Sequence, residues 1–305
     1  MANAMPAADV DVTVGLVREL LADQHPDLAE LPVSFLAAGW DNALFRLGDS
    51  LVIRLPRREA AALIIEHEQR WLPLLAPRLP IKVPCPHRTG HSAAIYPYSW
   101  SVVPYLPGVP AADASDSLDL ARVTPQLAGF FGALHVPAPL DAPANPYRGV
   151  PLADRAESFE ANFAISALSA GADALLASER EIRRGWADAL AAPAYSGVPV
   201  WLHGDAHPAN ILADGALISG VIDFGDITAG DPACDLSIAW MLLALDWHPA
   251  FRAAYLEGGV AAADGLWRRA RGWALNFALV YLAHSADNPR MYRIGEQALA
   301  RVLAD

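Results

Sequence analysis

The stretch that decides the fold is WLHGDAHPAN at residues 201–210, followed by VIDFGD at residues 221–226. The carboxylate of Asp205 and the carboxamide of Asn210 lie five residues apart, and Asp223 follows Asp205 by eighteen residues, after an apolar run typical of a strand. Phosphoryl transfer needs a carboxylate that orients and deprotonates a hydroxyl group, and two oxygen ligands for Mg²⁺. The stretch therefore predicts such a site, with Asp205 as the catalytic base and Asn210 and Asp223 as the metal ligands.

The same groups occur in protein kinases as H-R-D-x-x-x-x-N and D-F-G. Here the first motif reads His-Gly-Asp-x-x-x-x-Asn, and Asp-Phe-Gly is intact. The form H-G-D-x-H-P-x-N resembles the aminoglycoside phosphotransferase family, kinase-like enzymes that phosphorylate small molecules. The resemblance implies an α+β, bilobal protein-kinase-like fold, with a small N-terminal antiparallel sheet lobe that carries one key helix and a larger, mainly helical C-terminal lobe. It also implies transfer of phosphate from ATP or GTP to a hydroxyl group of a small molecule.

The predicted elements follow that order along the chain. Apolar patterns predict short strands at residues 33–37, 43–47, 51–55, 93–96, 100–103, 200–202 and 217–222. Helical spacing predicts helices at residues 10–21, 58–75, 120–134, 237–245 and 266–284, with further helical segments between 152 and 190. Asp9 or Asp11 would cap the first helix, and Pro73 would end or kink the second.

The proline-rich break at residues 104–108 is expected to be a hinge. Residues 1–103 would then form an N-terminal nucleotide-binding lobe. Residues 109–305 would form a C-terminal catalytic and substrate-binding lobe.

A cation for the nucleotide phosphates is expected in the strand at residues 51–55. Arg54 could clamp the α- and β-phosphates, although kinase relatives generally have lysine at this place. Glu68 lies in helical register with Trp71 and Leu75 on an apolar face, where a glutamate needs a cation. We therefore expect an ion pair between Arg54 and Glu68. The alternatives are a solvated strand arginine and a surface glutamate at the edge of the apolar face.

Two main-chain regions are expected to complete the nucleotide site. Residues 37–42 lie between two strands, where kinases carry a glycine-rich turn, and Gly39, Trp40 and Asn42 could cover phosphates although the turn has a single glycine.

The hinge is expected to hold adenine near Val103, Tyr105 and Leu106. Tyr105 or Leu106 would be the donor, because Pro104 has no N–H group. Ile222, directly before Asp223, is included in the nucleotide site.

Several further polar residues allow more than one interpretation. Asp231 precedes a proline and Asp235 lies four residues later, so both are expected to serve a helix start. Asp226 is expected to face the metal or the substrate. In aminoglycoside kinases, acidic residues of the C-terminal lobe hold ammonium groups, and the resemblance makes Asp287 and Glu296 the candidates here.

His203 and His207 are four residues apart, a spacing that zinc sites use on helices. Gly204 and Pro208 favour a loop instead. The resemblance implies that these histidines structure that loop.

Composition narrows the classes of molecule that the protein is expected to bind. The 305 residues include 34 acidic and 22 basic side chains, a formal net charge of −12. This charge disfavours a nucleic-acid partner. It can serve solubility alone, or it can attract a cationic acceptor, and together with the family resemblance it points to an aminoglycoside-like or other cationic antibiotic. Two cysteines, no signal-peptide pattern at the N-terminus and no apolar run long enough for a membrane span favour a cytoplasmic protein, and we expect a monomer or a weak dimer.

Two other functions remain open from the sequence. One is a metabolic kinase for an amino alcohol or a sugar. The other is a nucleotide-binding pseudokinase that regulates a partner, which Arg54 and the poor glycine turn suggest.

Overall fold

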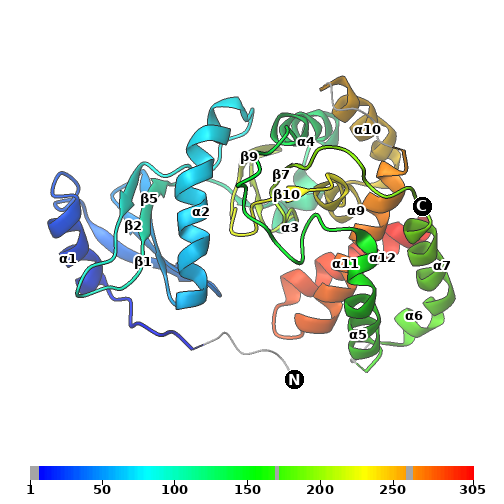
Figure 1. The fold of residues 1–305 in the computed structure, drawn as a ribbon, viewed down its shortest axis with the longest axis horizontal. Helices are drawn as coiled ribbons and strands as arrows, with labels where there is room; N and C mark the ends of the chain where they lie inside the picture. Colours follow the sequence, from blue (N-terminus) through cyan, green and yellow to red (C-terminus); the bar gives the residue numbers. More distant parts are fainter. Residues whose placement is uncertain (1–6, 169–171, 259–263) are drawn as a thin grey trace. The chain divides into compact units, whose positions relative to one another are not determined.

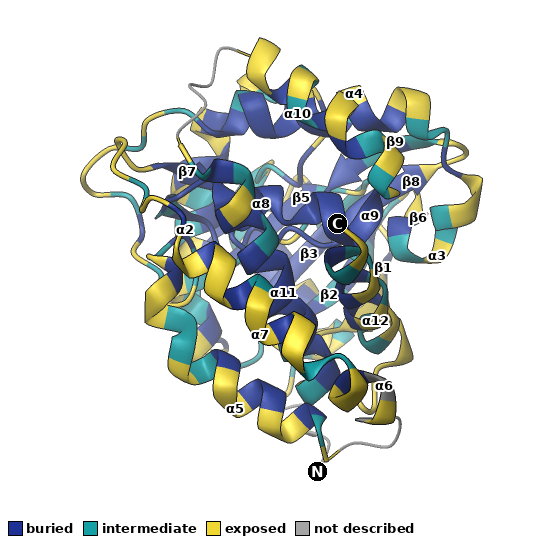
Figure 2. Ribbon diagram, turned by 90° about the vertical axis from the view of Figure 1, so that its right-hand side faces the viewer, coloured by how far each residue is buried: buried dark blue, intermediate teal, exposed yellow. Residues whose placement is uncertain are grey.

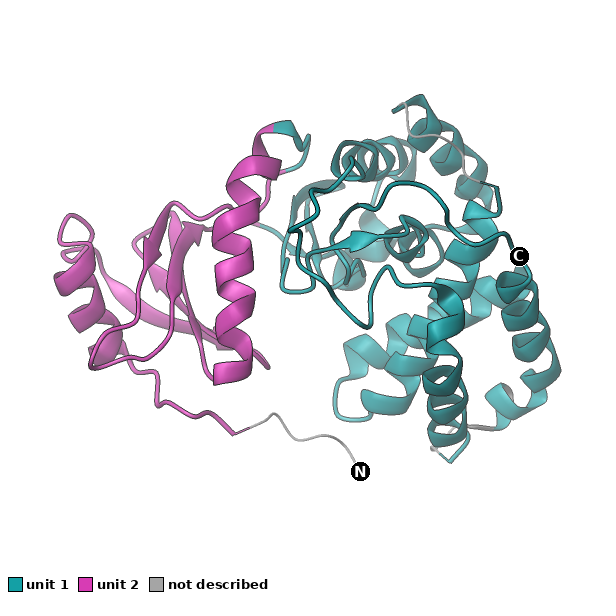
Figure 3. Ribbon diagram, viewed as in Figure 1, with its two compact units in different colours: residues 1–2, 78–81, 108–305 teal, residues 3–77, 82–107 magenta. Residues whose placement is uncertain are grey.

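The computed structural model describes residues 7–168, 172–258 and 264–305. The chain forms two compact units (Figure 3). The sheet unit contains the described part of Asn3–Pro77 together with Lys82–Pro107, and the helical unit contains Arg78–Ile81 and Gly108–Asp305.

The sheet unit is built on five antiparallel strands in the order β1-β2-β3-β5-β4. These strands are β1 (Val33–Ala38), β2 (Asn42–Leu47), β3 (Leu51–Pro56), β4 (Arg88–Gly90) and β5 (Trp100–Pro104). The sheet lies between helices α1 (Val14–Gln24) and α2 (Glu59–Leu75), as Figure 1 shows.

Strand β3 separates two environments because its side chains alternate between the faces of the sheet. Ile53 and Leu55 pack in a core with Leu20 and Leu21 of α1. Arg54, on the opposite face, reaches Glu68 of α2. The alternation expected from the sequence therefore decides which face carries the charged group.

Two details of the sheet unit differ from the sequence-based expectation. Thr13 caps α1 through its side-chain oxygen, whereas Asp9 accepts the N–H of Glu59 at 2.8 Å. Residues 93–96 form only an isolated bridge, since Ala93 and Tyr96 bond to each other across a tight turn, and the unpredicted β4 takes the edge of the sheet. Helix α2 ends at Leu75, as predicted, two residues after Pro73.

Helix α11 (Leu266–His284) is the centre of the helical unit. It packs against α5 (Ala156–Ser166), α7 (Glu179–Leu190), α8 (Ala233–Leu236) and α12 (Pro289–Ala304). Most of its side chains are buried, Arg269 and Asn276 among them, whereas α5 and α7 expose their outer faces (Figure 2).

The other helices of this unit are α3 (Ala111–Ala114), α4 (Leu120–Leu134), α6 (Ala172–Ala177), α9 (Ile238–Leu242) and α10 (His248–Glu257). The run at 237–245 does not form the single helix expected from its sequence. Ser237 separates α8 from α9, and Leu243 is already extended. Short 3₁₀ turns occur at Ala76–Arg78, Ser115–Ser117, Leu152–Arg155 and Leu245–Trp247.

Two small sheets position the motif residues. Strand β7 (Val200–Leu202) pairs with β10 (Thr228–Gly230), and β8 (Ile211–Asp214) pairs with β9 (Leu217–Val221) and β6 (Val109–Pro110). Residues 203–210 therefore connect β7 to β8, and residues 222–227 connect β9 to β10. Among the described helices, none combines the length and the apolar character that crossing a bilayer requires.

Candidate functional site

Asp235 of α8 holds the loop that follows β7 in place through the backbone of that loop. The fully buried carboxylate of Asp235 accepts the N–H of His203 at 2.7 Å and that of Gly204 at 2.9 Å. His135 and Tyr255 continue this buried network, with His135 Nε2 3.2 Å from Asp235 Oδ2 and His135 Nδ1 2.8 Å from the Tyr255 hydroxyl. Asp235 is therefore structural, as expected, but it orients the backbone directly before Asp205.

Gly204 is required at the turn into Asp205. Its φ is +84°, and a Cβ atom there would lie 2.2 Å from the carbonyl oxygen of Asp226. The segment 203–205 can therefore lie directly against the segment that contains Asp226 only because residue 204 has no side chain.

The two histidines of the loop have structural contacts. His203 Nδ1 accepts the N–H of Asp205 at 3.2 Å, and His203 Nε2 donates to the carbonyl of Ile222 at 2.9 Å. Both ring nitrogens of His203 are thus occupied by the backbone, which does not suit a zinc ligand. His207 Nε2 lies 3.2 Å from Asp205 Oδ2 and orients that carboxylate.

Asp205 occupies the centre of a polar cluster. Its Oδ1 lies 3.4 Å from Arg148 Nη2, and its Oδ2 lies 3.4 Å from Asn210 Nδ2 in addition to His207. Burial by itself raises the pKa of this carboxyl, but the charge and hydrogen bond of His207 and the charge of Arg148 hold the pKa well below its usual range. Asp205 is therefore ionised at neutral pH.

The two expected metal ligands lie on adjoining segments. Ile222 donates its N–H to the carbonyl of Asn210 at 2.9 Å, directly beside the β8–β9 pairing of Ile211 with Val221. Asp223, the next residue, has a φ of +63°, and its side chain is exposed. The expectation of a carboxylate at the end of a buried strand therefore holds for the strand but not for the side chain.

The donor set of these residues suits Mg²⁺. The side-chain hydrogen bonds of Asn210 are made by Nδ2, at 3.0 Å to the carbonyl of Asp205, and no donor in the described residues bonds its Oδ1. The carboxylate of Asp223 has no hydrogen bond or ion pair within the same described ranges. One amide oxygen and one carboxylate fit a metal that takes its other ligands from water and phosphate.

Asp226 lies beside this cluster. Asn145 donates to its Oδ1 at 2.7 Å, and Arg148 Nη2 lies 3.4 Å from its Oδ2. Burial raises the pKa of Asp226, and the neighbouring Asp205 carboxylate acts in the same direction. Sequence patterns missed Asn145 and Arg148, because the proline-rich loop that carries them has no periodicity.

The other acidic residues separate into two groups. Asp231 caps the start of α8 as expected, since its Oδ1 accepts the N–H of Ala233 at 3.0 Å, and it also forms a buried ion pair with Arg269 at 2.6 Å. Asp287 lies in the exposed turn before α12, and Glu296 is exposed on α12. No hydrogen bond or ion pair among the described residues joins either of them to Asp205.

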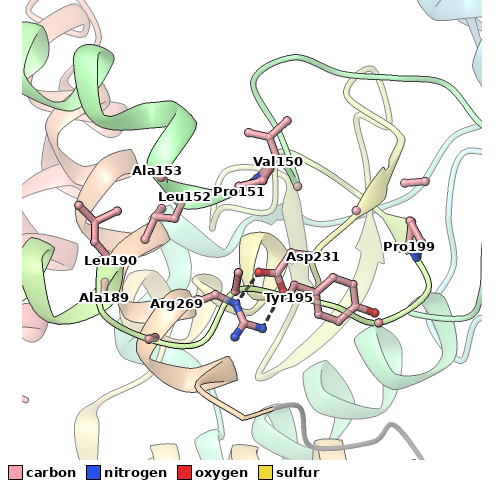
Figure 4. A pocket seen from close by; sticks show the side chains of 16 residues that line it. Val150, Pro151, Leu152, Ala153, Ala189, Leu190, Tyr195, Pro199, Asp231 and Arg269 are labelled. Atoms are coloured by element: carbon pink, nitrogen blue, oxygen red, sulfur yellow. Dashed lines mark hydrogen bonds and ion pairs between the residues drawn. The ribbon is translucent and has the colours of Figure 1, made fainter.

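A cavity of about 370 Å³ has Gly149, Val150 and Tyr195 among its lining residues (Figure 4). None of the site residues predicted from the sequence lines it. Its charged groups, Asp231 and Arg269, are bonded to each other, as the dashed lines in Figure 4 show. The cavity is therefore separate from the Asp205 cluster.

In the sheet unit, the predicted ion pair is confirmed. Arg54 Nη1 lies 2.7 Å from Glu68 Oε2, and the two side chains are 9% and 1% exposed. Helical periodicity thus identified the correct glutamate of α2.

The turn between β1 and β2 offers less to a phosphate than expected. The N–H of Gly39 donates to the carbonyl of Asn42 at 2.9 Å, which removes Gly39 as a phosphate donor. Arg57 and Arg58 bond the carbonyls of Gly39 and Trp40. Trp40 itself is 52% exposed.

Strand register corrects the expected adenine donor. The N–H of Tyr105 donates to the carbonyl of Ser50 at 2.7 Å, so Tyr105 is not available. Val103 pairs with Val52 inside the sheet. Because backbone groups alternate along a strand, Pro104 C=O points away from β3. Strand β5 ends there, and in the described residues no backbone carbonyl accepts the N–H of Leu106, so Leu106 remains as the candidate donor.

Comparison with solved structures gives the fold. The chain is similar to aminoglycoside 2'-phosphotransferase-IIIa in its GDP complex, with 19% identity, a TM-score of 0.67, and 94% of this chain and 97% of that chain covered. It is also similar to macrolide 2'-phosphotransferase MphH from Brachybacterium faecium, with 23% identity, a TM-score of 0.59, and 94% and 97% covered. A ternary complex of streptomycin, ATP and APH(2")-IIa matches at 16% identity and a TM-score of 0.58, with 94% and 95% covered.

These likenesses show a kinase-like fold with an antiparallel sheet in the N-terminal part and helices in the C-terminal part. No curated protein sequence matches the chain. The model of the phosphotransferase enzyme family matches residues 32–273. Because this match spans most of the 305 residues, the chain belongs to the phosphotransferase enzyme family.

Proposed function

We propose that this phosphotransferase moves the γ-phosphoryl group of ATP or GTP to a hydroxyl group of a small molecule. The observation that carries the proposal is the ionised Asp205, held by His207 at 3.2 Å on a loop whose other end carries Asn210. A carboxylate in this position orients the acceptor hydroxyl and accepts its proton as the phosphoryl group leaves the nucleotide.

The sheet unit would supply most of the nucleotide contacts. Arg54, held by Glu68, would contact the α- and β-phosphates, and Leu106 N–H with Pro104 C=O would bind the base. In this proposal residues 1–103 form the nucleotide-binding lobe, 104–108 the hinge and 109–305 the catalytic lobe. Trp40, Asn42, Val103 and Ile222 would line the same nucleotide site.

Asn210 Oδ1 and the Asp223 carboxylate would hold Mg²⁺. The bound ion would neutralise the phosphate oxygens and fix the γ-phosphate. The protein supplies the orientation of both ligands through the Ile222–Asn210 backbone bond.

The acceptor would be an antibiotic-like polyhydroxyl compound. The related solved structures are enzymes for aminoglycosides and macrolides. The net charge of −12 favours a cationic compound of this kind, with Asp226, Asp287 and Glu296 as the carboxylates that could receive it. Antibiotic resistance would be the cellular consequence.

Two other functions predict different outcomes of one assay. A metabolic kinase would prefer an amino alcohol or a sugar over every antibiotic. A pseudokinase would bind nucleotide and transfer nothing. The assay incubates the protein with ATP or GTP, Mg²⁺ and a panel of kanamycin, erythromycin, choline and sugars, and detects phosphorylated product by mass spectrometry.

Asp205→Ala gives the residue-level test within this assay. Loss of the base is expected to lower transfer by about 10²–10⁴-fold, while the fold and nucleotide affinity stay unchanged. Asp214→Ala, at the exposed end of β8, is the matched control and should retain full activity. Phosphorylation by Asp205→Ala near the wild-type rate would rule out this assignment.

A further inference from the structure

Arg148 connects two carboxylates of the helical unit. Its Nη2 lies 3.4 Å from Oδ1 of Asp205 and 3.4 Å from Oδ2 of Asp226. The guanidinium group lies over the ring of Phe277, 5.0 Å from its centroid, and the side chain is 19% exposed. No other arginine or lysine of the described residues forms an ion pair with Asp205.

The loop that carries Arg148 is anchored on both sides of that residue. Before it, Asn145 donates to Asp226 at 2.7 Å, and Thr228 Oγ1 donates to the carbonyl of Pro143 at 2.8 Å. After it, the carbonyl of Gly149 accepts the N–H of Asp231 at 2.9 Å. These bonds hold the backbone of Arg148 against the catalytic loop.

Gly149 explains how the loop comes so close. Its φ is +64°, and a Cβ atom would lie 2.4 Å from Leu202 Cδ1 and 3.1 Å from the Cα of Gly230. The backbone of Gly149 therefore lies directly on β7 and β10, the strands that begin and end the two functional segments. The Arg148 side chain therefore extends from a backbone segment that is packed against these strands.

Arg148 counteracts the repulsion between two carboxylates of the site. Asp205 and Asp226 are neighbouring carboxylates, and two like charges at close range repel unless a cation lies between them. His207 holds Oδ2 of Asp205, and Arg148 holds Oδ1. The two contacts together fix the plane of the carboxylate, which a contact with a single oxygen would leave free to rotate.

We propose that Arg148 is a positioning residue for phosphoryl transfer, which holds the Asp205 carboxylate in the orientation that receives the acceptor hydroxyl and separates it from Asp226. The proposal rests on the proposed function of Asp205. A positioning role affects the transfer step, because the proposed nucleotide contacts do not include Arg148. A merely structural ion pair would instead affect stability and nucleotide binding together.

The test compares the wild type with Arg148→Lys, Arg148→Gln and Arg148→Ala, using the acceptor that gives the fastest transfer. Misplacement of the base is expected to lower kcat of Arg148→Gln by about 10²-fold, while KM for ATP and the melting temperature change little. Arg148→Lys should lie between Arg148→Gln and the wild type. Added guanidinium at millimolar concentration should raise kcat of Arg148→Ala but not that of the wild type.

Arg155→Gln is the matched control. Arg155 lies in the 3₁₀ turn Leu152–Arg155 directly after this loop, bonds Ser158 and lies over the ring of Tyr147, but it does not contact Asp205. This variant should keep the wild-type kcat. If the uncharged Arg148 variants do not fold, Asn145→Ala, which loosens the loop and keeps the charge, should show a smaller loss of kcat with an unchanged KM for ATP.

Two results overturn the positioning role while the proposed function survives. One is a kcat equal to that of the wild type in the folded Arg148 variants. Where the uncharged variants do not fold, the same result in both Arg148→Lys and Asn145→Ala has this meaning. The other is a loss of kcat accompanied by an equal loss of nucleotide affinity, with no rescue by guanidinium. Absence of transfer by the wild type to every acceptor overturns the proposed function and this inference together.

Discussion

At the scale of single residues, Asp223 decides how the metal site can be tested. Its φ of +63° is a left-handed conformation, which alanine adopts at an energetic cost and asparagine tolerates. A change to alanine would therefore combine backbone strain with the loss of the carboxylate. Asparagine removes the charge alone.

We expect Asp223→Asn to reduce Mg²⁺-dependent ATP binding more than Asn210→Ala does, because Asp223 supplies the charge of the proposed metal site. Calorimetric titration of ATP with and without Mg²⁺ measures the metal-dependent part of the affinity. Asp223→Gly, which relaxes the backbone, should resemble Asp223→Asn. An Mg²⁺ dependence equal to that of the wild type in both variants would show that Asp223 is not a ligand.

The Arg54–Glu68 pair gives a second residue-scale prediction. Removal of one partner leaves a buried charge, so Arg54→Met and Glu68→Gln should each lower the free energy of unfolding by about 3–5 kcal/mol. The double variant should be less destabilised than the sum of both, and Arg54→Lys should keep much of the activity. Urea denaturation measures all four free energies.

The exposed pair Arg88–Asp27, 3.4 Å apart in the same unit, is the control for this cycle. Its coupling should stay below about 1 kcal/mol. Additive effects at Arg54 and Glu68 would mean that the buried contact does not stabilise the unit.

At the scale of elements, the loop after β7 depends on a short helix that is distant in sequence. Asp235 of α8 accepts two backbone N–H groups of that loop, at 2.7 and 2.9 Å. Asp235→Ala leaves both groups buried without an acceptor, at about 1–3 kcal/mol each. We expect a lower free energy of unfolding. We also expect a loss of transfer rate greater than this destabilisation alone explains, because the backbone before Asp205 is no longer held in place.

Urea denaturation and the transfer assay check this expectation side by side. Asp246→Ala, in the exposed 3₁₀ turn after α9, serves as the control. Full activity in a folded Asp235→Ala protein would contradict the role assigned to this carboxylate.

The same comparison of elements explains what the sequence can and cannot predict. Asp205, Asn210 and Asp223 occur at fixed spacing within one motif region, and Glu68 follows from helical periodicity. Arg148 acts across 57 residues from a loop with no pattern, so only the folded chain reveals its contacts.

The sequence also does not show which main-chain N–H groups are free to bind a ligand. The sequence shows that Pro104 lacks an N–H group, but the loss of Tyr105 as a donor depends on the register of β3 against β5. Long-range pairing, rather than local propensity, sets that register.

At the scale of the whole molecule, buried histidines make stability depend on pH. Burial lowers the pKa of His248, which is 3% exposed, below the value of about 6.5 that it has in the unfolded chain. Below that pH the unfolded state binds the proton more readily, so the contribution of His248 is fully present above about pH 6.5 and is lost as pH falls through the folded pKa. The more exposed His25 and His67, whose pKa values burial also lowers, contribute less.

We therefore expect the free energy of unfolding to fall less between pH 7 and pH 5 in His248→Gln than in the wild type. Urea denaturation at several pH values gives the free energy of unfolding against pH for both proteins. The difference between the two slopes isolates the effect of His248, because the effect of the net charge is common to both. His91→Gln, on the exposed surface, controls for the loss of an imidazole. Parallel curves for wild type and His248→Gln would exclude this contribution.

The exposed Trp40 gives the chain an optical probe at the turn between β1 and β2. Of the nine tryptophans, all of which the structure describes, only Trp40 is exposed, at 52%, while Trp100, Trp240 and Trp273 are fully buried. Its fluorescence should form the red edge of the emission spectrum and should be the part that acrylamide quenches first. A nucleotide bound beside this turn would change that emission alone, and Trp40→Phe would provide the blank.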